Sequence, residues 1–176
     1  MRNGRDQPIR RWALFVAGLV ACWYPMTAVH ESGHVLHAWL SGGRVERVVL
    51  HPLEFSRTDV APNPHPQFVA WGGAIWGTCF PLIVAQAVRR ARRRIARTAR
   101  FFAGYCFVAN GVYLGSAVVM PVGDAEDLIR FGVPGAVVAA MGLCGWVCGL
   151  LIWRTIFRYE RTHRVATPSA IRPPAD

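Results

Sequence analysis

Four long apolar stretches constrain the fold of this chain more than any other feature of its sequence. A helix needs ~20 mostly apolar residues to cross the hydrocarbon core of a bilayer. Each stretch is at least that long, and the last three contain no charged residue. Hydrophobic residues make up 53% of the chain, which excludes intrinsic disorder. We therefore predict transmembrane helices over residues 12–40, 68–88, 101–120 and 134–153.

The distribution of arginine indicates how these spans are oriented. The chain has a net charge of +10, and all 20 of its basic residues are arginines. Sixteen of them lie in residues 2–11, 89–100 and 154–172, which an even number of spans places on one side of the membrane. An excess of arginine marks the cytoplasmic side. We predict a multi-pass protein of the cell membrane whose N- and C-termini are cytoplasmic.

The arginine block at residues 89–100 also bears on the partners of the protein. It lies between two apolar spans and contains no aromatic residue, whereas surfaces for single-stranded nucleic acid combine basic and aromatic side chains. We assign it to topology and to lipid headgroups, and we expect membrane lipids but no nucleic acid as partners. The five cysteines lie inside apolar runs and are odd in number, which argues against a disulfide scaffold.

The first span carries the motif with the clearest chemistry, His30-Glu31-Ser32-Gly33-His34. On a helix the two histidines lie one turn apart on the same face, where both imidazoles can bind one metal ion. Glu31 is rotated from His30 by about 100°, so it can act as general base on a water that the metal activates. Ionisable groups in a membrane helix cost about 2.5–3.5 kcal/mol each and mark a functional site. We predict one Zn²⁺ ion bound by His30 and His34, with Glu31 as the catalytic residue.

A catalytic zinc site needs a third protein ligand. Three carboxylates, those of Asp124, Glu126 and Asp127, follow the third span on the side of the membrane where the first span ends. Asp124 is the first candidate and Asp127 the second, although capping the start of a helix would suit both of them as well. The remaining candidates are three histidines outside the motif, His37, His51 and His65.

The segment after the first span does not have a helical pattern. Valines between residues 45 and 49 follow two glycines, and prolines at positions 62, 64 and 66 precede the second span. This pattern predicts a short hairpin or β-ribbon that returns to the membrane. The predicted fold class is an all-α polytopic membrane protein with about four transmembrane helices and a β-hairpin-like segment after the first. Residues 1–153 form a single membrane domain, and residues 154–176 form a short basic, proline-containing tail.

Together these features resemble the site-2 protease family of intramembrane zinc metallopeptidases, in its small bacterial-type form. The resemblance extends over roughly residues 30–130. It rests on the H-E-x-x-H motif, the Gly42-Gly43-Arg44-Val45 turn, the glycine-rich second span and an aspartate after the third. It implies that His30 and His34 bind zinc with Asp124 as third ligand, and that Glu31 is the catalytic base. It also implies that the hairpin-like segment offers an edge to an unwound substrate.

One motif of the family has a different sequence here. The usual third-ligand motif is Leu-Asp-Gly, closely preceded by asparagine and proline, whereas this chain has Gly123-Asp124-Ala125. The nearest asparagine is Asn110, inside the third span, and we assign it a polar role.

The leading functional hypothesis is an enzyme, a zinc metalloendopeptidase that hydrolyses peptide bonds in or near the membrane. Its substrate would be a transmembrane or membrane-proximal protein. The alternative is a catalytically degenerate metal-binding membrane adaptor or regulator, which has no need of Glu31. A metal transporter would require more polar residues along a pathway than the second to fourth spans contain.

Overall fold

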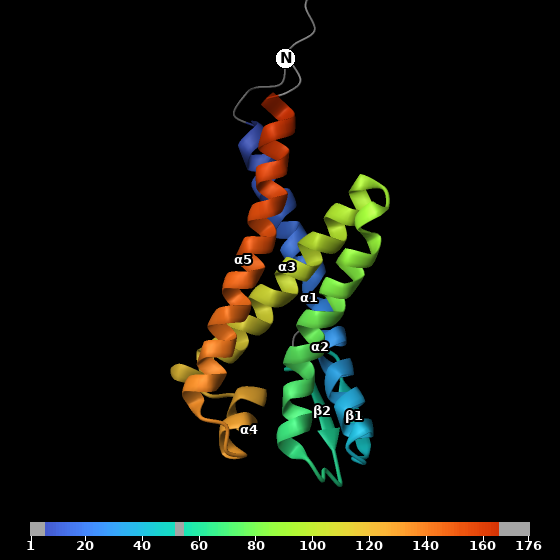
Figure 1. The fold of residues 1–176 in the computed structure, drawn as a ribbon, viewed down its shortest axis with the longest axis vertical. Coiled ribbons are helices and arrows are strands. Elements are labelled where there is room, and N and C mark those ends of the chain that lie inside the picture. The colour runs from blue at the N-terminus through green and yellow to red at the C-terminus, as the bar shows by residue number, and fades with distance from the viewer. Residues whose placement is uncertain (1–5, 52–54, 166–176) are drawn as a thin grey trace, which may run out of the picture.

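The computed structural model describes residues 6–51 and 55–165 of the chain. Four of its helices are long and apolar enough to cross a membrane, and a small two-stranded sheet follows the first helix (Figure 1). The predicted fold class is therefore confirmed. The elements in chain order are α1 (Asp6–Leu40), β1 (Val45–Val49), β2 (Arg57–Val60), α2 (Pro66–Ala87), the 3-10 helix η1 (Val88–Arg90), α3 (Arg93–Gly115), the 3-10 helix η2 (Ser116–Val118), α4 (Asp124–Arg130) and α5 (Gly135–Val165).

Three helices extend further than the sequence predicts, each at its arginine-rich end. α1 begins at Asp6, six residues before the predicted span. α3 begins at Arg93, inside the block expected to be a loop, and α5 continues to Val165, into the predicted tail. Arginine is a good helix former, and its long side chain can reach from a helix end toward lipid headgroups, so it does not end a membrane helix. Residues 1–5 and 166–176, which belong to the basic N-terminal segment and the tail, lie outside the described residues.

The two ends of the bundle differ in what they carry. The start of α1, the turn between α2 and α3 and the end of α5 lie at one end, and the hairpin and α4 lie at the other (Figure 1). The arginine-rich segments therefore gather at one end, as an even number of spans requires. The assignment of that end to the cytoplasm stays a prediction.

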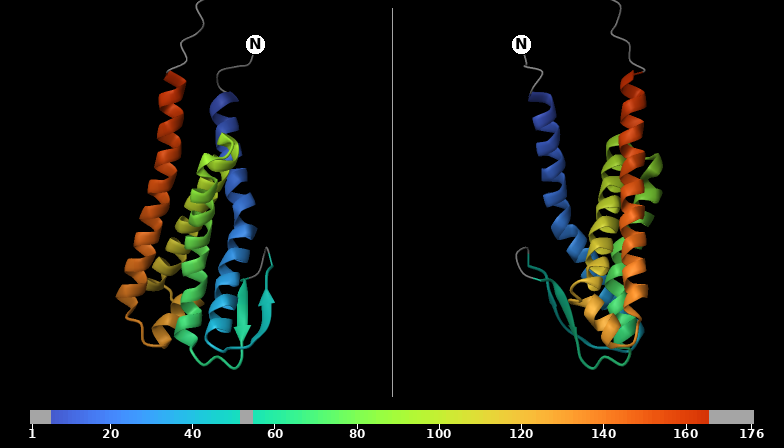
Figure 2. Two further views of the ribbon diagram at one scale, coloured as in Figure 1. Left: turned by 45° about the vertical axis from the view of Figure 1, so that its right-hand side comes forward. Right: turned by 90° about the vertical axis from the view of Figure 1, so that its left-hand side faces the viewer.

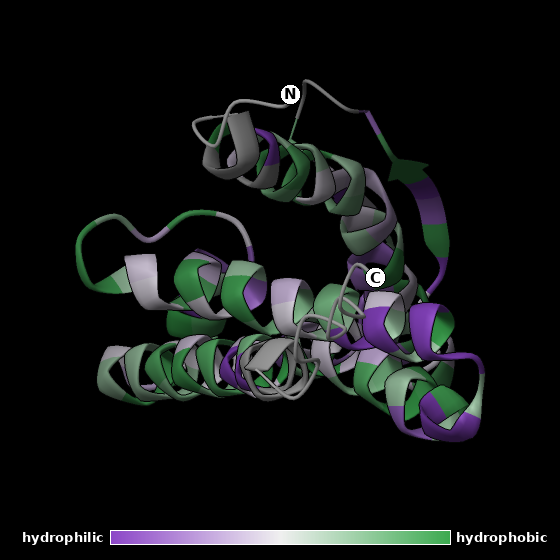
Figure 3. Cartoon of the chain, turned by 90° about the horizontal axis from the view of Figure 1, so that it is seen from above, coloured by the Kyte–Doolittle hydropathy of each residue, from purple (hydrophilic) through white to green (hydrophobic). Residues whose placement is uncertain are grey.

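The outer surface of the bundle suits a lipid environment. Apolar residues predominate along the helices when the bundle is seen from above (Figure 3). Large hydrophobic side chains on different helices, such as Leu14, Ile83 and Leu143, are more than half exposed. Exposed side chains of this kind would be costly in water and are favourable against lipid tails.

The hairpin forms where the valine-rich segment was predicted. β1 and β2 are antiparallel, with Val49 opposite Arg57 and Val45 opposite Val60. Two backbone hydrogen bonds close the base of the hairpin. The Arg44 N–H donates to the Pro62 carbonyl at 3.1 Å, and the Ala61 N–H donates to the Arg44 carbonyl at 2.9 Å. The hairpin lies beside the C-terminal part of α1 (Figure 2). The N-terminal part of α1 contacts α5 through aromatic rings, with the centroids of Phe15 and Trp153 5.8 Å apart.

The short helix α4 is fixed in place by the apolar core. Ala125 and Leu128 are fully buried. They pack in one cluster with residues from three membrane helices, namely Ala70 and Ala74 of α2, Leu114 of α3 and Val138 of α5. Because residues 125 and 128 point into this core, the first residue of α4 is held at a defined position near α1.

Candidate metal centre

Two histidines of α1 face α2 near the end of the bundle that carries the hairpin. His30 and His34 lie one helical turn apart, and their rings meet edge to face with centroids 4.9 Å apart. Both are buried, with 8% and 5% of their surface exposed. Gly73 of α2 keeps the space in front of them open, because a Cβ there would collide with the Nε2 atoms of both rings. The motif therefore presents two imidazole nitrogens toward one point.

The first residue of α4 completes the cluster. Asp124 Oδ2 lies 2.8 Å from His30 Nε2 and 3.2 Å from His34 Nε2, and the two Nε2 atoms are 3.2 Å apart. The structure thus brings together the three side chains that the sequence indicated as ligands. The histidines and the aspartate come from segments 94 residues apart, so the cluster depends on the tertiary fold.

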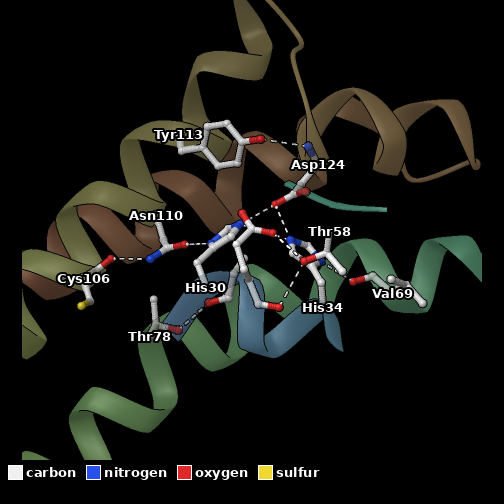
Figure 4. A network of polar contacts seen from close by, with 11 residues as sticks. His30, His34, Thr58, Val69, Thr78, Cys106, Asn110, Tyr113 and Asp124 are labelled. Carbon is white, nitrogen blue, oxygen red and sulfur yellow. Dashed lines mark hydrogen bonds and ion pairs between the residues drawn. The ribbon is translucent and has the colours of Figure 1, made fainter. Parts of the chain in front are cut away.

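The other nitrogen of each ring is already engaged in a hydrogen bond (Figure 4). His30 Nδ1 donates to Asn110 Oδ1 at 2.6 Å, and His34 Nδ1 donates to the carbonyl oxygen of Val69 at 2.8 Å. Both partners are acceptors, so each ring carries a proton on Nδ1 and directs Nε2 toward Asp124. Three electron-rich atoms this close repel one another unless a cation or a shared proton lies among them.

The donor set and its spacing fit a zinc ion. Ligand atoms ~2.0–2.1 Å from a tetrahedral Zn²⁺ are about 3.3 Å from one another, and two of the three separations here are 3.2 Å. Two imidazoles and one carboxylate form a typical ligand set of catalytic zinc sites, which leave a fourth position for water or substrate. His30, His34 and Asp124 are the residues that would hold the ion.

The carboxylates of Asp124 and Asp127 differ in their surroundings. Burial opposes ionisation of Asp124, but the imidazoles of His30 and His34 outweigh that effect and hold the pKa of Asp124 below its usual range. Burial, followed by the negative charge of Asp124, raises the pKa of Asp127. Asp127 lines the same cavity but is not part of the donor cluster. Of the two candidates, Asp124 is the anionic group at the histidines.

Glu31 lies next to the cluster without belonging to it. Only 2% of its surface is exposed. The hydroxyl of Thr58, on β2, donates a hydrogen bond to Glu31 Oε2 at 2.8 Å. Glu31 also lines the cavity that the two imidazoles line. A carboxylate that is oriented in this way is placed to accept a proton at the site.

Tyr113 of α3 helps to position Asp124. The Asp124 N–H donates a hydrogen bond to the Tyr113 hydroxyl at 3.0 Å, and the Tyr113 ring lies edge-on to His30 with centroids 5.9 Å apart. Gly123 has a φ of +56°, and a Cβ there would collide with the same hydroxyl. Gly123, rather than Asp124, is the N-cap residue of α4, which leaves the Asp124 carboxylate to the histidines.

A cavity of about 1540 Å³ opens from the cluster. Three residues of the motif, His30, Glu31 and His34, line one part of it together with Asp124. From there it extends along α1 as far as Phe15, with further walls formed by α3, α5 and the hairpin. The cavity is larger than the ~300–1,000 Å³ typical of small-molecule pockets, so a longer chain can enter it.

The other predicted ligand candidates lie outside the donor cluster. His37 is one turn further along α1, where its Nδ1 donates to the Phe68 carbonyl at 2.6 Å and its ring stacks on the Phe68 ring. His65 is the exposed N-cap residue of α2, and the exposed His51 follows β1. Within residues 6–51 and 55–165, the donor cluster includes none of these histidines.

Thr58 and Tyr113 are site contacts that sequence reasoning missed. Thr58 follows Glu31 by 27 residues and Tyr113 precedes Asp124 by 11, so neither contact has a helical or strand periodicity. A threonine in a strand and a tyrosine near the end of a membrane span are both common, and neither residue type singles out a site. Asn110, for which a polar role was expected, contacts His30 directly.

No protein-family model, no curated protein and no solved structure matches this chain. The resemblance to the site-2 protease family therefore stays a hypothesis that rests on the sequence alone, namely on the H-E-x-x-H motif, the turn into the hairpin, the glycine-rich second span and the aspartate after the third.

Proposed function

We propose that this chain is an intramembrane zinc metalloendopeptidase of the site-2 protease type. The observation that carries the proposal is the convergence of His30, His34 and Asp124 on one point, with Glu31 beside them in the same cavity. A protein that only binds a metal needs the three ligands but has no use for a buried carboxylate next to them.

The residues of the site divide the work of peptide hydrolysis. Zn²⁺, when bound by His30, His34 and Asp124, supplies Lewis-acid chemistry, lowering the pKa of a water toward ~7 and polarising the scissile carbonyl. Glu31 accepts the proton of the attacking water and delivers it to the amine as the carbon–nitrogen bond breaks. The Thr58 hydroxyl holds Glu31 in the orientation that this transfer requires.

The cavity and the hairpin support a proposal for the class of substrate. It opens between membrane helices and is bounded by β2, all four of whose residues line it. Among the described elements β2 pairs only with β1, so its second edge is available to an extended peptide. The proposed substrate is therefore a segment of a transmembrane or membrane-proximal protein that enters between the helices and unwinds next to β2.

The test is to separate metal binding from hydrolysis with three variants of the full chain purified in detergent. Glu31→Gln keeps the shape of the side chain but cannot accept a proton, so it should retain zinc and lose about 10²–10⁴-fold in cleavage of a membrane-embedded peptide reporter. Asp124→Ala should lose zinc itself. Glu126→Gln makes the same charge change at an exposed residue of α4 and should leave both properties unchanged.

Two results would decide against the proposal. Wild-type hydrolysis by the Glu31→Gln variant would remove Glu31 from the mechanism. A zinc-loaded wild-type protein that cleaves no membrane-embedded peptide would favour the alternative, a metal-binding adaptor or regulator, which the departure of Gly123-Asp124-Ala125 from the Leu-Asp-Gly motif also favours. Zinc content and peptide cleavage are measured on the same preparation, so the two functions are told apart directly.

A further inference from the structure

Asn110 is a polar side chain in an unfavourable place. It lies within the candidate membrane span of α3, and only 3% of its surface is exposed. A carboxamide in an apolar environment costs several kcal/mol unless its donors and acceptor are bonded. Asn110 offsets this cost with two hydrogen-bond partners, one for its NH₂ group and one for its carbonyl oxygen.

The partners of Asn110 fix the orientation of its amide. Asn110 Nδ2 donates a hydrogen bond to the Cys106 carbonyl at 2.8 Å, and a carbonyl can only accept. The NH₂ group thus points toward Cys106, and Oδ1 points toward His30 Nδ1 at 2.6 Å. It follows that His30 carries its proton on Nδ1 and its lone pair on Nε2, the atom that faces Asp124.

The helix opposite Asn110 is shaped to accommodate this amide. Gly77 of α2 lies against it, and a Cβ at that position would be 2.9 Å from Asn110 Nδ2 and 3.0 Å from Oδ1. Any larger residue at position 77 would push the amide away from His30. One hydrogen-bonded chain therefore runs from the Cys106 carbonyl of α3 through Asn110 to His30 of α1 (Figure 4), and Gly77 of α2 leaves room for it.

The second histidine is held differently. His34 Nδ1 donates to the main-chain carbonyl of Val69, which no substitution of a side chain removes. Of the two histidines in the cluster, His30 is the one whose Nδ1 depends on a replaceable side-chain acceptor. A substitution of Asn110 therefore changes the hydrogen bond of His30 and leaves that of His34 in place, so its effect on metal binding can be measured at one histidine alone.

We propose that Asn110 is a positioning residue of the metal centre, which sets the tautomer and the ring orientation of His30. The inference rests on the proposed metal site, but not on peptidase activity. Groups that orient zinc-bound histidines typically contribute about 10–100-fold to metal affinity. Asn110 should act through His30 Nε2 and should change the geometry of the bound metal as well as its affinity.

The experiment is a titration with Co²⁺, whose visible absorption reports ligand geometry, on the purified full chain. Asn110→Leu removes the acceptor but keeps a similar volume and suits the membrane, so its Co²⁺ affinity should fall about 10–100-fold with an altered spectrum. Asn110→Asp keeps an acceptor for His30 and should restore affinity and spectrum. Thr78→Val is the control, because the Thr78 hydroxyl donates hydrogen bonds to carbonyl oxygens of its own helix.

Each outcome decides the matter. A wild-type spectrum and affinity in Asn110→Leu would overturn the proposal, and so would a wild-type chain that binds no Co²⁺. Loss in Asn110→Leu without recovery in Asn110→Asp would identify the residue as a packing element and would also overturn it. Wild-type Co²⁺ binding without peptide cleavage would refute the proposed peptidase and leave the role of Asn110 intact.

Discussion

Glycines bring helices together at two places in this bundle, with opposite consequences. Between α3 and α5, a Cβ at Gly142 would lie 2.6 Å from Gly115 Cα, so backbone meets backbone. Between α1 and α2, the space next to Gly73 is bordered instead by the Nε2 atoms of His30 and His34. The first contact leaves no room for a side chain, and the second keeps room in front of two imidazoles.

The comparison shows that the same residue type brings backbones together in one helix pair and leaves space at the proposed metal site in the other. Close packing of small residues is a general means of holding membrane helices together. A glycine that faces polar atoms has a further effect, since any side chain there would occupy the place of a bound ion. Substitutions at the two positions should therefore separate folding from metal binding.

The largest effect is expected for Gly73→Ala. Its methyl group would collide with the Nε2 atoms of His30 and His34. Zinc affinity should therefore fall by about 10–100-fold or more, since disturbances around zinc ligands typically have effects of this size. The thermal unfolding midpoint should change little, because the close approach of α1 and α2 at Gly33 and Gly72 is left intact. Zinc content after dialysis, together with thermal unfolding in detergent, measures both. Normal zinc binding in this variant would remove the distinction between the two glycine contacts.

Gly142→Ala should show the reverse pattern. The added methyl group meets backbone atoms of α3 that cannot move independently, so α5 is displaced and the free energy of unfolding should fall by about 1–3 kcal/mol. Zinc bound per folded molecule should stay at the wild-type value. Gly115→Ala is the matched control, since its Cβ would have no neighbour nearer than 3.9 Å. Equal destabilisation by the two variants would contradict the backbone-contact explanation.

The smallest effect is expected at the two ends of α4, where Gly123 precedes the helix, Gly132 follows it, and both have positive φ. Gly123→Ala adds strain and a collision with the Tyr113 hydroxyl, so Asp124 should shift and zinc affinity fall about 10-fold. Gly132 has a φ of +98°, so Gly132→Ala adds backbone strain of the same kind, but the added Cβ would have no neighbouring atom within 4 Å. It should reduce the free energy of unfolding by roughly 1–2 kcal/mol without affecting zinc binding. Isothermal titration with zinc measures the affinity of the Gly123→Ala and Gly132→Ala variants. Similar losses of zinc affinity in the two variants would show that Tyr113 does not position Asp124.

The fold was predictable because a membrane span is a local property of the sequence. An apolar run of sufficient length forms a helix in lipid whatever surrounds it, since its backbone must bond internally. Helix ends were less predictable. α3 begins at Arg93 and α5 reaches Val165, because arginine neither breaks a helix nor requires the chain to leave it.

The site was predictable to the extent that its residues are close in sequence or limited by topology. His30, Glu31 and His34 share one helix face by their spacing alone. Asp124 was indicated by topology, because the ends of α1 and α3 must emerge on the same side. The contacts of Thr58 with Glu31 and of Tyr113 with Asp124 arise only from the packing of the hairpin and α3, which no spacing along the chain encodes.

The separation of the ligands along the chain has a consequence for biosynthesis. His30 enters the membrane with the first helix, whereas Asp124 is translated 94 residues later, after the third helix. Its place also depends on the packing of Ala125 and Leu128 against α2. A growing polypeptide with two inserted helices therefore has both histidines but lacks their anionic partner. Under the proposed function, the metal would therefore be acquired late in synthesis, after the third helix has been inserted and α4 has packed.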